Sequence, residues 1–118
     1  MEYLLLIHSD DEPLKTMPKD TQAAQVAAYG AYTRALQEAG VLRGANRLRP
    51  ASTATTVRLR DGKTQVQNGP FIETREELGG YYLIDVKDLD TALSWAARCP
   101  AAAHGVMDVR PVWPMNEN

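Results

Sequence analysis

The sequence predicts an α+β domain in which an antiparallel sheet carries two helices on one face. Helical periodicity occurs in two separate segments, and short apolar runs of strand length precede and follow each of them. The order along the chain is β-α-β-β-β-α-β, a split β-α-β pattern with a hairpin inserted in its middle. With 118 residues the chain has the length of one domain, residues 1–118.

The first strand and the first helix occupy the N-terminal third. Residues Tyr3 to His8 are mostly apolar and predict a strand, which ends in a polar, acidic loop. A helix is expected to begin at Asp20 or Thr21, either of which can cap it. It runs to about Ala39, and Gly40 suits its C-terminal cap. One stripe of this helix is mostly alanine, which predicts close packing against its neighbour. The stripe consists of Ala24, Ala28, Ala31, Tyr32, Ala35, Leu36 and Ala39.

The middle of the chain contains a hairpin. Asp61-Gly62 is the strongest two-residue turn signal in the sequence, and it joins predicted strands at Thr55 to Arg60 and Lys63 to Gln67. This turn places the valines of the two strands on one side and the charged residues near the turn on the other. The preceding segment, Val41 to Pro50, is a connector that can hold a short strand.

The C-terminal part begins at the Gly79-Gly80 pair, which we expect to form a bulge or to let another backbone pass close by. A strand from Tyr81 to Val86 follows. The second helix spans Leu89 to Arg98, with Asp88 as its N-cap, and its apolar residues have a clear amphipathic spacing. The last strand runs from Val106 to Val112.

Four of these strands form a ferredoxin-like sheet with both helices on one face. Two helices cannot cover the second face. The strands at Tyr3 to Ile7 and Tyr81 to Val86 are nevertheless apolar in both alternating sets of residues, so the second face should also be buried. Sheet-to-sheet packing of a second copy supplies the missing cover. The sequence therefore predicts an obligate homodimer.

The composition narrows the class of protein. A formal charge of −2 argues against a general nucleic-acid binder, and the N-terminal apolar run is too short for a signal peptide or a membrane span. We therefore expect a cytoplasmic protein with no direct contact to nucleic acid or membrane. One cysteine, Cys99, and two separated histidines offer no metal-ligand spacing, and no cofactor is expected.

The segment from Asn68 to Tyr82, the strand that follows it, the helix at Leu89 to Arg98 and the ending Val109 to Val112 resemble the YCII-related family, specifically its DGPF-domain branch. The likeness spans nearly the whole chain. It implies the dimeric α+β-barrel form of the ferredoxin-like fold. Many family members are uncharacterised bacterial proteins, and some occur with extracytoplasmic-function sigma factors. Related barrels include small enzymes that act on aromatic or lactone substrates.

Two departures from the family pattern bear on catalysis. The signature Asp-Gly-Pro-Phe appears here as Asn68-Gly69-Pro70-Phe71, and asparagine keeps the turn-forming shape but loses the charge and the option of proton transfer. For enzymes of the wider family, the resemblance implies a histidine–aspartate pair whose histidine lies on the first helix. This helix carries Tyr29 and Tyr32 and no histidine. Both changes argue against acid–base catalysis by the family's usual route.

His8 and Asp10 are the candidate catalytic residues. His8 stands at the end of the first strand, where it could act as a general base oriented by Asp10 or by a carboxylate from elsewhere. The alternative is a strand-end histidine that is hydrogen-bonded to backbone or water. His104 lies in an alanine-rich loop and is expected to face solvent.

Five residues are the candidates for ligand binding. Asn68 could hold a ligand or cap the Gly-Pro turn, and Phe71 should be packed, either as core or as pocket wall. Glu73 could supply a carboxylate or lie on a solvated surface. Arg110 lies within the last strand, where a buried or half-buried arginine needs a carboxylate or a bound anion. Tyr81 follows the glycine pair at the start of its strand.

These observations predict a small-molecule pocket between helices and sheet or at the barrel mouth. The residues expected near it are His8, Asn68, Phe71, Tyr81 and Arg110. The leading interpretation is a homodimeric ligand-binding or regulatory accessory protein, with a sigma factor as one candidate partner. The alternative is a small cofactor-independent lyase or isomerase that uses a histidine or a carboxylate as general base.

Overall fold

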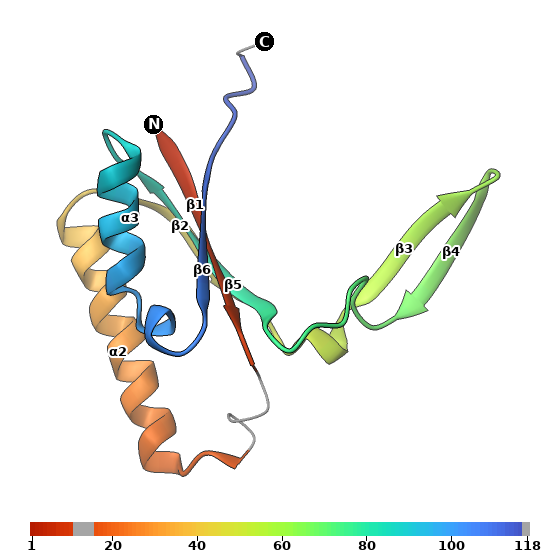
Figure 1. The fold of residues 1–118 in the computed structure, drawn as a ribbon, viewed down its shortest axis with the longest axis horizontal. Helices are drawn as coiled ribbons and strands as arrows, with labels where there is room; N and C mark the ends of the chain where they lie inside the picture. Colours follow the sequence, from red (N-terminus) through yellow and green to blue (C-terminus); the bar gives the residue numbers. More distant parts are fainter. Residues whose placement is uncertain (11–15, 117–118) are drawn as a thin grey trace.

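The computed structural model describes residues 1–10 and 16–116, whose arrangement is shown in Figure 1. In these ranges the elements are β1 (Glu2–Ser9), α2 (Lys19–Glu38), β2 (Leu42–Arg47), η1 (Ala51–Thr53), β3 (Thr55–Arg60), β4 (Lys63–Asn68), β5 (Glu77–Asp85), α3 (Leu89–Arg98), η2 (Pro100–Ala103) and β6 (Val106–Pro111). No helix among them is long and apolar enough to cross a membrane. The polar loop that the sequence places after the first strand lies partly outside the described residues.

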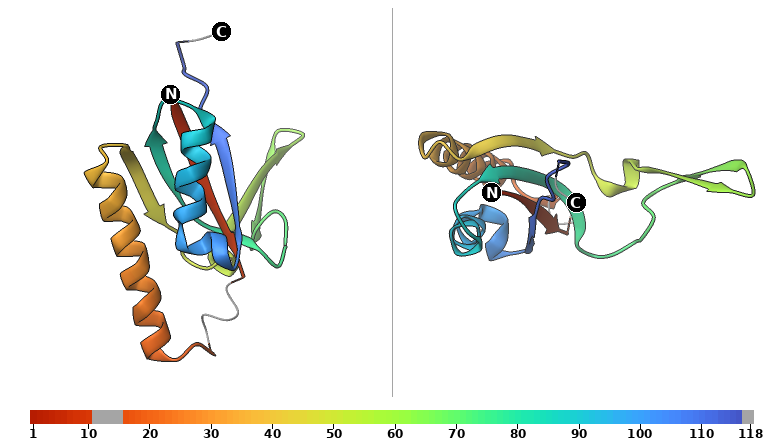
Figure 2. Two further views of the ribbon diagram at one scale, coloured as in Figure 1. Left: turned by 60° about the vertical axis from the view of Figure 1, so that its left-hand side comes forward. Right: turned by 90° about the horizontal axis from the view of Figure 1, so that it is seen from above.

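Four strands form the main sheet in the spatial order β2-β5-β1-β6, and every neighbouring pair is antiparallel. Both α-helices pack on one face of this sheet, as the two views in Figure 2 show. Two β-α-β units that interleave in this way define the ferredoxin-like arrangement. The predicted α+β, ferredoxin-like fold is therefore confirmed, and the short strand expected in the connector is the edge strand β2.

The core lies between the helices and the sheet. The strand residues that alternate toward the helices are buried, and Leu5 and Ile84 have no exposed surface. Tyr32 of α2 meets Tyr82 of β5 edge-on, with ring centroids 5.2 Å apart. The Tyr32 hydroxyl also donates a hydrogen bond to the Trp95 carbonyl oxygen of α3 at 2.8 Å. One tyrosine thus joins both helices to the sheet.

Helix α2 contacts the sheet through Tyr32 and Leu36, which are both buried. The prediction that an alanine stripe makes this contact is wrong for most of the stripe, because Ala24, Ala28 and Ala31 are exposed. A tyrosine or leucine removes far more apolar surface from water than an alanine does, so the large side chains determine how the helix is rotated.

Glycine and aspartate end and begin the helices as the sequence predicts. Gly40 follows α2 with a φ of +73°, and the next amide, of Val41, donates to the Leu36 carbonyl oxygen at 3.2 Å, which is the Schellman pattern. Asp88 caps α3, since its carboxylate accepts a hydrogen bond from the Thr91 amide at 2.9 Å.

The N-terminus of α2 differs from the prediction. The helix begins at Lys19, after Pro18, and no side chain caps it. Asp20, one of the two expected caps, lies inside the first turn instead, where its negative charge interacts favourably with the helix dipole. The fixed φ of proline suits the residue that leads into a helix, although its side chain, unlike a polar cap, accepts no hydrogen bond from the amides of the first turn.

Strand β5 begins at Glu77, earlier than the predicted start at Tyr81, so the glycine pair lies inside it. The pairing with β1 shifts by one residue at this point, which makes Gly79 the extra residue of a β-bulge. At Gly80 a Cβ atom would lie 2.8 Å from the Asn46 carbonyl oxygen of β2. The pair therefore serves both expected purposes, since Gly79 forms the bulge and Gly80 allows the close backbone approach.

The second face of the sheet carries no helix, and we name it the open face. On its central strands Leu4 pairs with Leu83 and Leu6 pairs with Tyr81, and all four side chains are half-buried. The face is therefore apolar at its centre, as predicted. The residues that the register places on it in β1, β5 and β6 are Glu2, Leu4, Leu6, His8, Leu78, Tyr81, Leu83, Asp85, Val106, Asp108 and Arg110.

Strands β3 and β4 form a separate two-stranded sheet, which we name the arm (residues 55–68). Its register follows the Asp61-Gly62 turn and places Val57 opposite Val66, as predicted. Figure 1 shows the arm projecting on the side of the main sheet away from the helices. The radius of gyration is 16.4 Å, whereas a compact chain of this length has about 13.5 Å. The difference reflects an arm that extends beyond the body.

We predict that Gly80→Ala destabilises the protein and that Gly79→Ala does so much less. The added Cβ at Gly80 would meet the Asn46 carbonyl oxygen at 2.8 Å, so two backbones must separate. We expect a loss of about 1–3 kcal/mol in the free energy of unfolding. At Gly79 the nearest atoms are Ser9 Oγ and the Ile7 carbonyl oxygen, at 3.8 and 3.9 Å, which is ordinary contact. Urea unfolding measures both variants, and equal losses would contradict this account.

Candidate functional site

A half-open cavity of about 800 Å³ lies between α2 and the end of the sheet where β1 ends and β5 begins. It exists because the sheet carries small residues at this end. Gly80 and Ala45 face the helix side here, whereas Leu5 and Ile84 fill the core farther along the same face. The glycine required by the close approach of two backbones thus also leaves the space for a cavity.

Apolar and aromatic side chains make up much of the cavity wall. Tyr29 and Val26 come from α2, Tyr82 comes from β5, and Leu48 follows β2. Burial raises the pKa of Tyr29 to about 12, although the nearby Arg47 guanidinium acts in the opposite direction. The Tyr29 phenol therefore stays protonated at neutral pH, where it can donate a hydrogen bond into the cavity.

Arg47 brings a positive charge to the cavity. It ends β2, and the register places it opposite Gly80, whose lack of a side chain leaves room beside it. Among the described residues its guanidinium has no ion-pair partner. The planar fork of five N–H donors in an arginine matches a carboxylate or phosphate group. Asn46 and Tyr81 also border the cavity, but the register places their side chains on the open face, where a hydrogen bond of 2.7 Å joins them.

Two of the residues predicted from sequence line the cavity, namely Asp10 and Tyr81. The Asp10 carboxylate accepts a hydrogen bond from Arg75 Nε at 3.3 Å, and this ion pair ties the end of β1 to the segment before β5. The Tyr81 hydroxyl accepts from the Asn46 amide. Both side chains therefore have protein partners, and that of Tyr81 lies on the open face.

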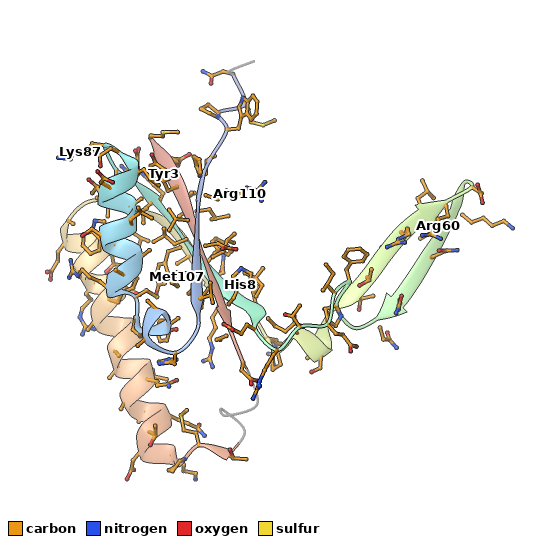
Figure 3. All side chains as sticks on the ribbon, viewed as in Figure 1. Tyr3, His8, Arg60, Lys87, Met107 and Arg110 are labelled. Atoms are coloured by element: carbon orange, nitrogen blue, oxygen red, sulfur yellow. The ribbon has the colours of Figure 1, made fainter. Side chains whose placement is uncertain are left out.

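His8 lies on the open face, whereas its neighbour Ile7 lines the cavity. Its Nε2 atom is 3.1 Å from Asp108 Oδ2 of β6, so the carboxylate beside it is Asp108 and not Asp10. The distance is that of an ion pair, but the atoms are not aligned as a hydrogen bond, and Nε2 is shielded from solvent. Figure 3 labels His8 and Arg110 on the side away from the helices and Met107 toward them.

Arg110 also belongs to the open face, two residues beyond Asp108 on the same strand and opposite Leu4 of β1. In a single chain its side chain is exposed. The expectation that it is buried or half-buried is therefore wrong for the isolated chain, because β6 is an edge strand and nothing in the described residues covers this face of it.

Three predicted residues lie on or next to the arm, away from the cavity wall. Asn68 is the last residue of β4, and Glu73 is exposed in the connection to β5. Phe71 is 69% exposed, and the Arg58 guanidinium lies over its ring at 5.2 Å. The expectation that Phe71 is packed in a core or pocket wall is wrong for the single chain, since the segment runs along the arm and not against the sheet.

The predicted residues thus fall into three groups, at the cavity, on the open face and at the arm. Two cavity residues, Tyr29 and Arg47, were not predicted from the sequence. His104 also lines the cavity, whereas it was expected to be a solvent-facing loop residue. A glycine in a buried strand was the available signal, because it leaves space next to its cross-strand neighbours. To place the cavity next to this glycine, one must also know the register of β2 against β5. That register cannot be predicted from the sequence, because β2 is short and has no clear apolar alternation.

Metal chemistry and thiol chemistry find little support in the described residues. Within residues 1–10 and 16–116, no three histidine, cysteine or carboxylate side chains gather as a metal ion requires. Cys99 is a buried free cysteine, and burial raises the pKa of its thiol. A neutral, buried thiol fits the packing role expected for it.

Comparison with known proteins gives a consistent result. The family model for the YCII-related domain matches residues 1–116. An uncharacterised protein of Rhizobium meliloti is 37% identical over 114 residues, which cover 95% of this chain and 92% of that protein. The match includes the sheet, both helices, the arm and the residues of the cavity. The chain therefore belongs to the YCII-related family.

Proposed function

We propose that this protein binds a small organic molecule in the cavity next to α2 and acts as a homodimer. The observation that carries the proposal is the cavity of about 800 Å³, a size typical of ligand pockets. Its wall is largely apolar and holds a few polar groups, including Arg47. Sites of this composition use the apolar wall for affinity and the polar groups to orient the ligand.

The lining favours a planar anion, such as an aromatic carboxylate, as the ligand. Tyr29 and Tyr82 offer aromatic rings against which a flat molecule can pack. Arg47 offers a cation that can pair with a carboxylate in a bidentate manner. The protonated Tyr29 phenol can add a hydrogen bond to the same anionic group.

We predict that benzoate-type compounds raise the melting temperature and that Ala45→Trp abolishes this effect. Ala45 is exposed and lines the cavity, so a tryptophan there fills the space without displacing the core. Arg47→Gln should weaken benzoate binding about tenfold or more, since a charge-assisted pair is worth about 1.5–3 kcal/mol. Binding of the neutral analogue benzamide should change little. Thermal shift and calorimetry measure these effects.

Two variants control for the substitutions themselves. Ala27→Trp places the same indole on an exposed part of α2 away from the cavity wall, and Arg49→Gln removes a charge two residues beyond Arg47. Both should bind as the wild type does. If no aromatic carboxylate binds, the ligand class is wrong. If binding occurs and survives Ala45→Trp, the ligand occupies another site.

A regulatory role fits this proposal, with the ligand held and released unchanged. Helix α2 forms one wall of the cavity, so its position against the sheet depends on what the cavity holds. A ligand that favours one position would change the outer surface of the helix, where a partner protein could bind. The family resemblance makes a sigma factor one candidate for that partner.

The open face supports the homodimer. An antiparallel sheet that faces water on one side normally carries polar residues there. Here Leu4, Leu6 and Leu83 occupy the centre of that face. Two sheets packed face to face, about 10 Å apart, bury such residues between them. A second copy presents the same apolar centre, so the contact is self-complementary.

We predict a molar mass of twice the chain's 13.0 kDa by light scattering during size-exclusion chromatography. Leu6→Asp should shift the protein toward monomer, because it introduces a charge at the centre of the buried contact. Leu89→Asp provides the matched control, since Leu89 is an exposed leucine at the start of α3, away from the open face. A wild-type monomer at micromolar concentration would refute the homodimer.

Acid–base catalysis is the second candidate function. Asp10 and His104 both line the cavity, and the pair of His8 and Asp108 lies on the open face. Either arrangement supplies the groups that a lyase or isomerase needs for general base catalysis.

Product analysis after incubation with bound compounds tests this function. Loss of a product in His104→Gln would place the reaction in the cavity, and loss in His8→Gln would place it on the open face. Ligand recovered unchanged with the wild type favours binding without turnover.

A further inference from the structure

The arm is an unsupported hairpin. Its two strands hydrogen-bond to each other and belong to no larger sheet. One of its faces carries Val57, Leu59 and Val66, which are 64%, 69% and 64% exposed. An isolated two-stranded hairpin is marginally stable in water and needs a third strand or another apolar surface against it. The arm's own chain does not provide that surface among the described residues.

The arm and the open face lie on the same side of the molecule. Figure 1 and the view from above in Figure 2 both show the helices on one side of the main sheet and the arm on the other. Six residues per strand, at about 3.3 Å each, give the arm a length of about 20 Å. Two stacked sheets are separated by only about 10 Å. A body seated on the open face therefore lies within reach of the arm.

We propose that the arm is an intersubunit clamp, which binds the body of a second copy through the apolar face of Val57, Leu59 and Val66. This inference rests on the proposed homodimer and specifies how it is held. The two open faces pack against each other. Each arm extends beyond this contact and lies along the outside of the partner's sheet. A two-fold axis makes the two arm contacts identical.

The charge distribution favours a second copy as the occupant of the arm. The arm contains three basic residues and one acidic residue, a charge of +2 within a chain whose total charge is −2. The rest of the chain therefore carries −4. The basic residues lie on the face of the arm opposite Val57, Leu59 and Val66, so they attract a body of opposite charge at long range while the apolar face makes the contact. The basic residues are Arg58, Arg60 and Lys63.

The Asn68-Gly69-Pro70-Phe71 segment sets the direction of the arm. Gly69 has a φ of +99°, a conformation that favours glycine. Its amide donates to the Ala54 carbonyl oxygen at 2.7 Å, and its carbonyl oxygen accepts from Thr56 Oγ1 at 2.8 Å. These bonds join the two strands at the base of the hairpin. The segment thus forms the base of the clamp, and the Arg58 guanidinium over the Phe71 ring places Phe71 against the face of the arm opposite Val57, Leu59 and Val66.

Photo-crosslinking tests the clamp directly. Leu59 is replaced by p-benzoylphenylalanine in one variant, and Arg60, its neighbour on the opposite face of the arm, in a second. Irradiation of the purified protein should give a band of doubled mass for the Leu59 variant, at a yield several-fold above that of the Arg60 variant. Light scattering before irradiation establishes that each variant is dimeric.

A pair of charge substitutions provides a second measurement. Val66→Asp places a carboxylate on the apolar face, and Gln65→Asp places the same charge on the opposite face of the same strand. The dimer dissociation constant should rise at least about tenfold for Val66→Asp, which corresponds to about 1.4 kcal/mol. It should change little for Gln65→Asp. Because the arm does not pack against its own body, neither substitution should alter unfolding of the monomer.

The outcomes separate the clamp from the homodimer. A dimeric wild type that gives no doubled band and tolerates Val66→Asp would overturn the clamp and leave the homodimer intact. Equal crosslinking from both faces of the arm would also overturn it, since the apolar face would have no special role. A monomeric wild type would refute the homodimer and the clamp together. Crosslinking restricted to the Leu59 variant, with weakened dimers of Val66→Asp, would support the clamp.

Discussion

The pairing of β1 with β5 at the centre of the sheet determines how the rest of the chain is arranged. Each strand is apolar in both directions, with Leu5 and Ile84 toward the helices and Leu4 and Leu83 toward the open face. Within residues 1–10 and 16–116, helices cover one of these faces and not the other. Apolar surface that stays in water costs about 25 cal/mol per Å². The open face and the arm thus both expose apolar surface in the single chain. The proposed second copy would bury both.

The same packing creates the cavity. Large side chains fill the space between sheet and helices at one end, whereas Gly80 must remain small because β2 passes directly beside it. Stability and the proposed ligand binding therefore depend on the same missing side chain. This differs from the usual conflict in which a binding site weakens its scaffold, since here a close backbone contact of the sheet and the space of the cavity require the same residue.

Elements with a strong local signal could be predicted from the sequence. The Asp61-Gly62 turn and the Gly40 and Asp88 caps each act within a few residues, and the structure confirms them. The bounds of α3 are also confirmed, but among its regularly spaced apolar residues Ala92 and Ala96 are buried whereas Leu89, Leu93 and Ala97 are exposed. The orientation of α2 could not be predicted from the sequence, because it depends on which side chains pack against one another across the core. The site was predicted least well. His8, Arg110 and Phe71 occupy strand ends and loops whose surroundings come from distant strands, and their separation into three regions follows from tertiary contacts that no local pattern encodes.

The central position of β1 also has a consequence for biosynthesis. This strand precedes both of its neighbours, β5 and β6, along the chain, so during synthesis Tyr3 must wait for Ile84 and then for Pro111. Contacts between residues so distant in sequence form slowly, because a long loop must close before any hydrogen bond is gained. During that delay β1 is an apolar strand with two unpaired edges, and other nascent chains can pair with it and aggregate. Chaperone capture of β1, followed by release once β6 has been made, would protect the polypeptide through this interval.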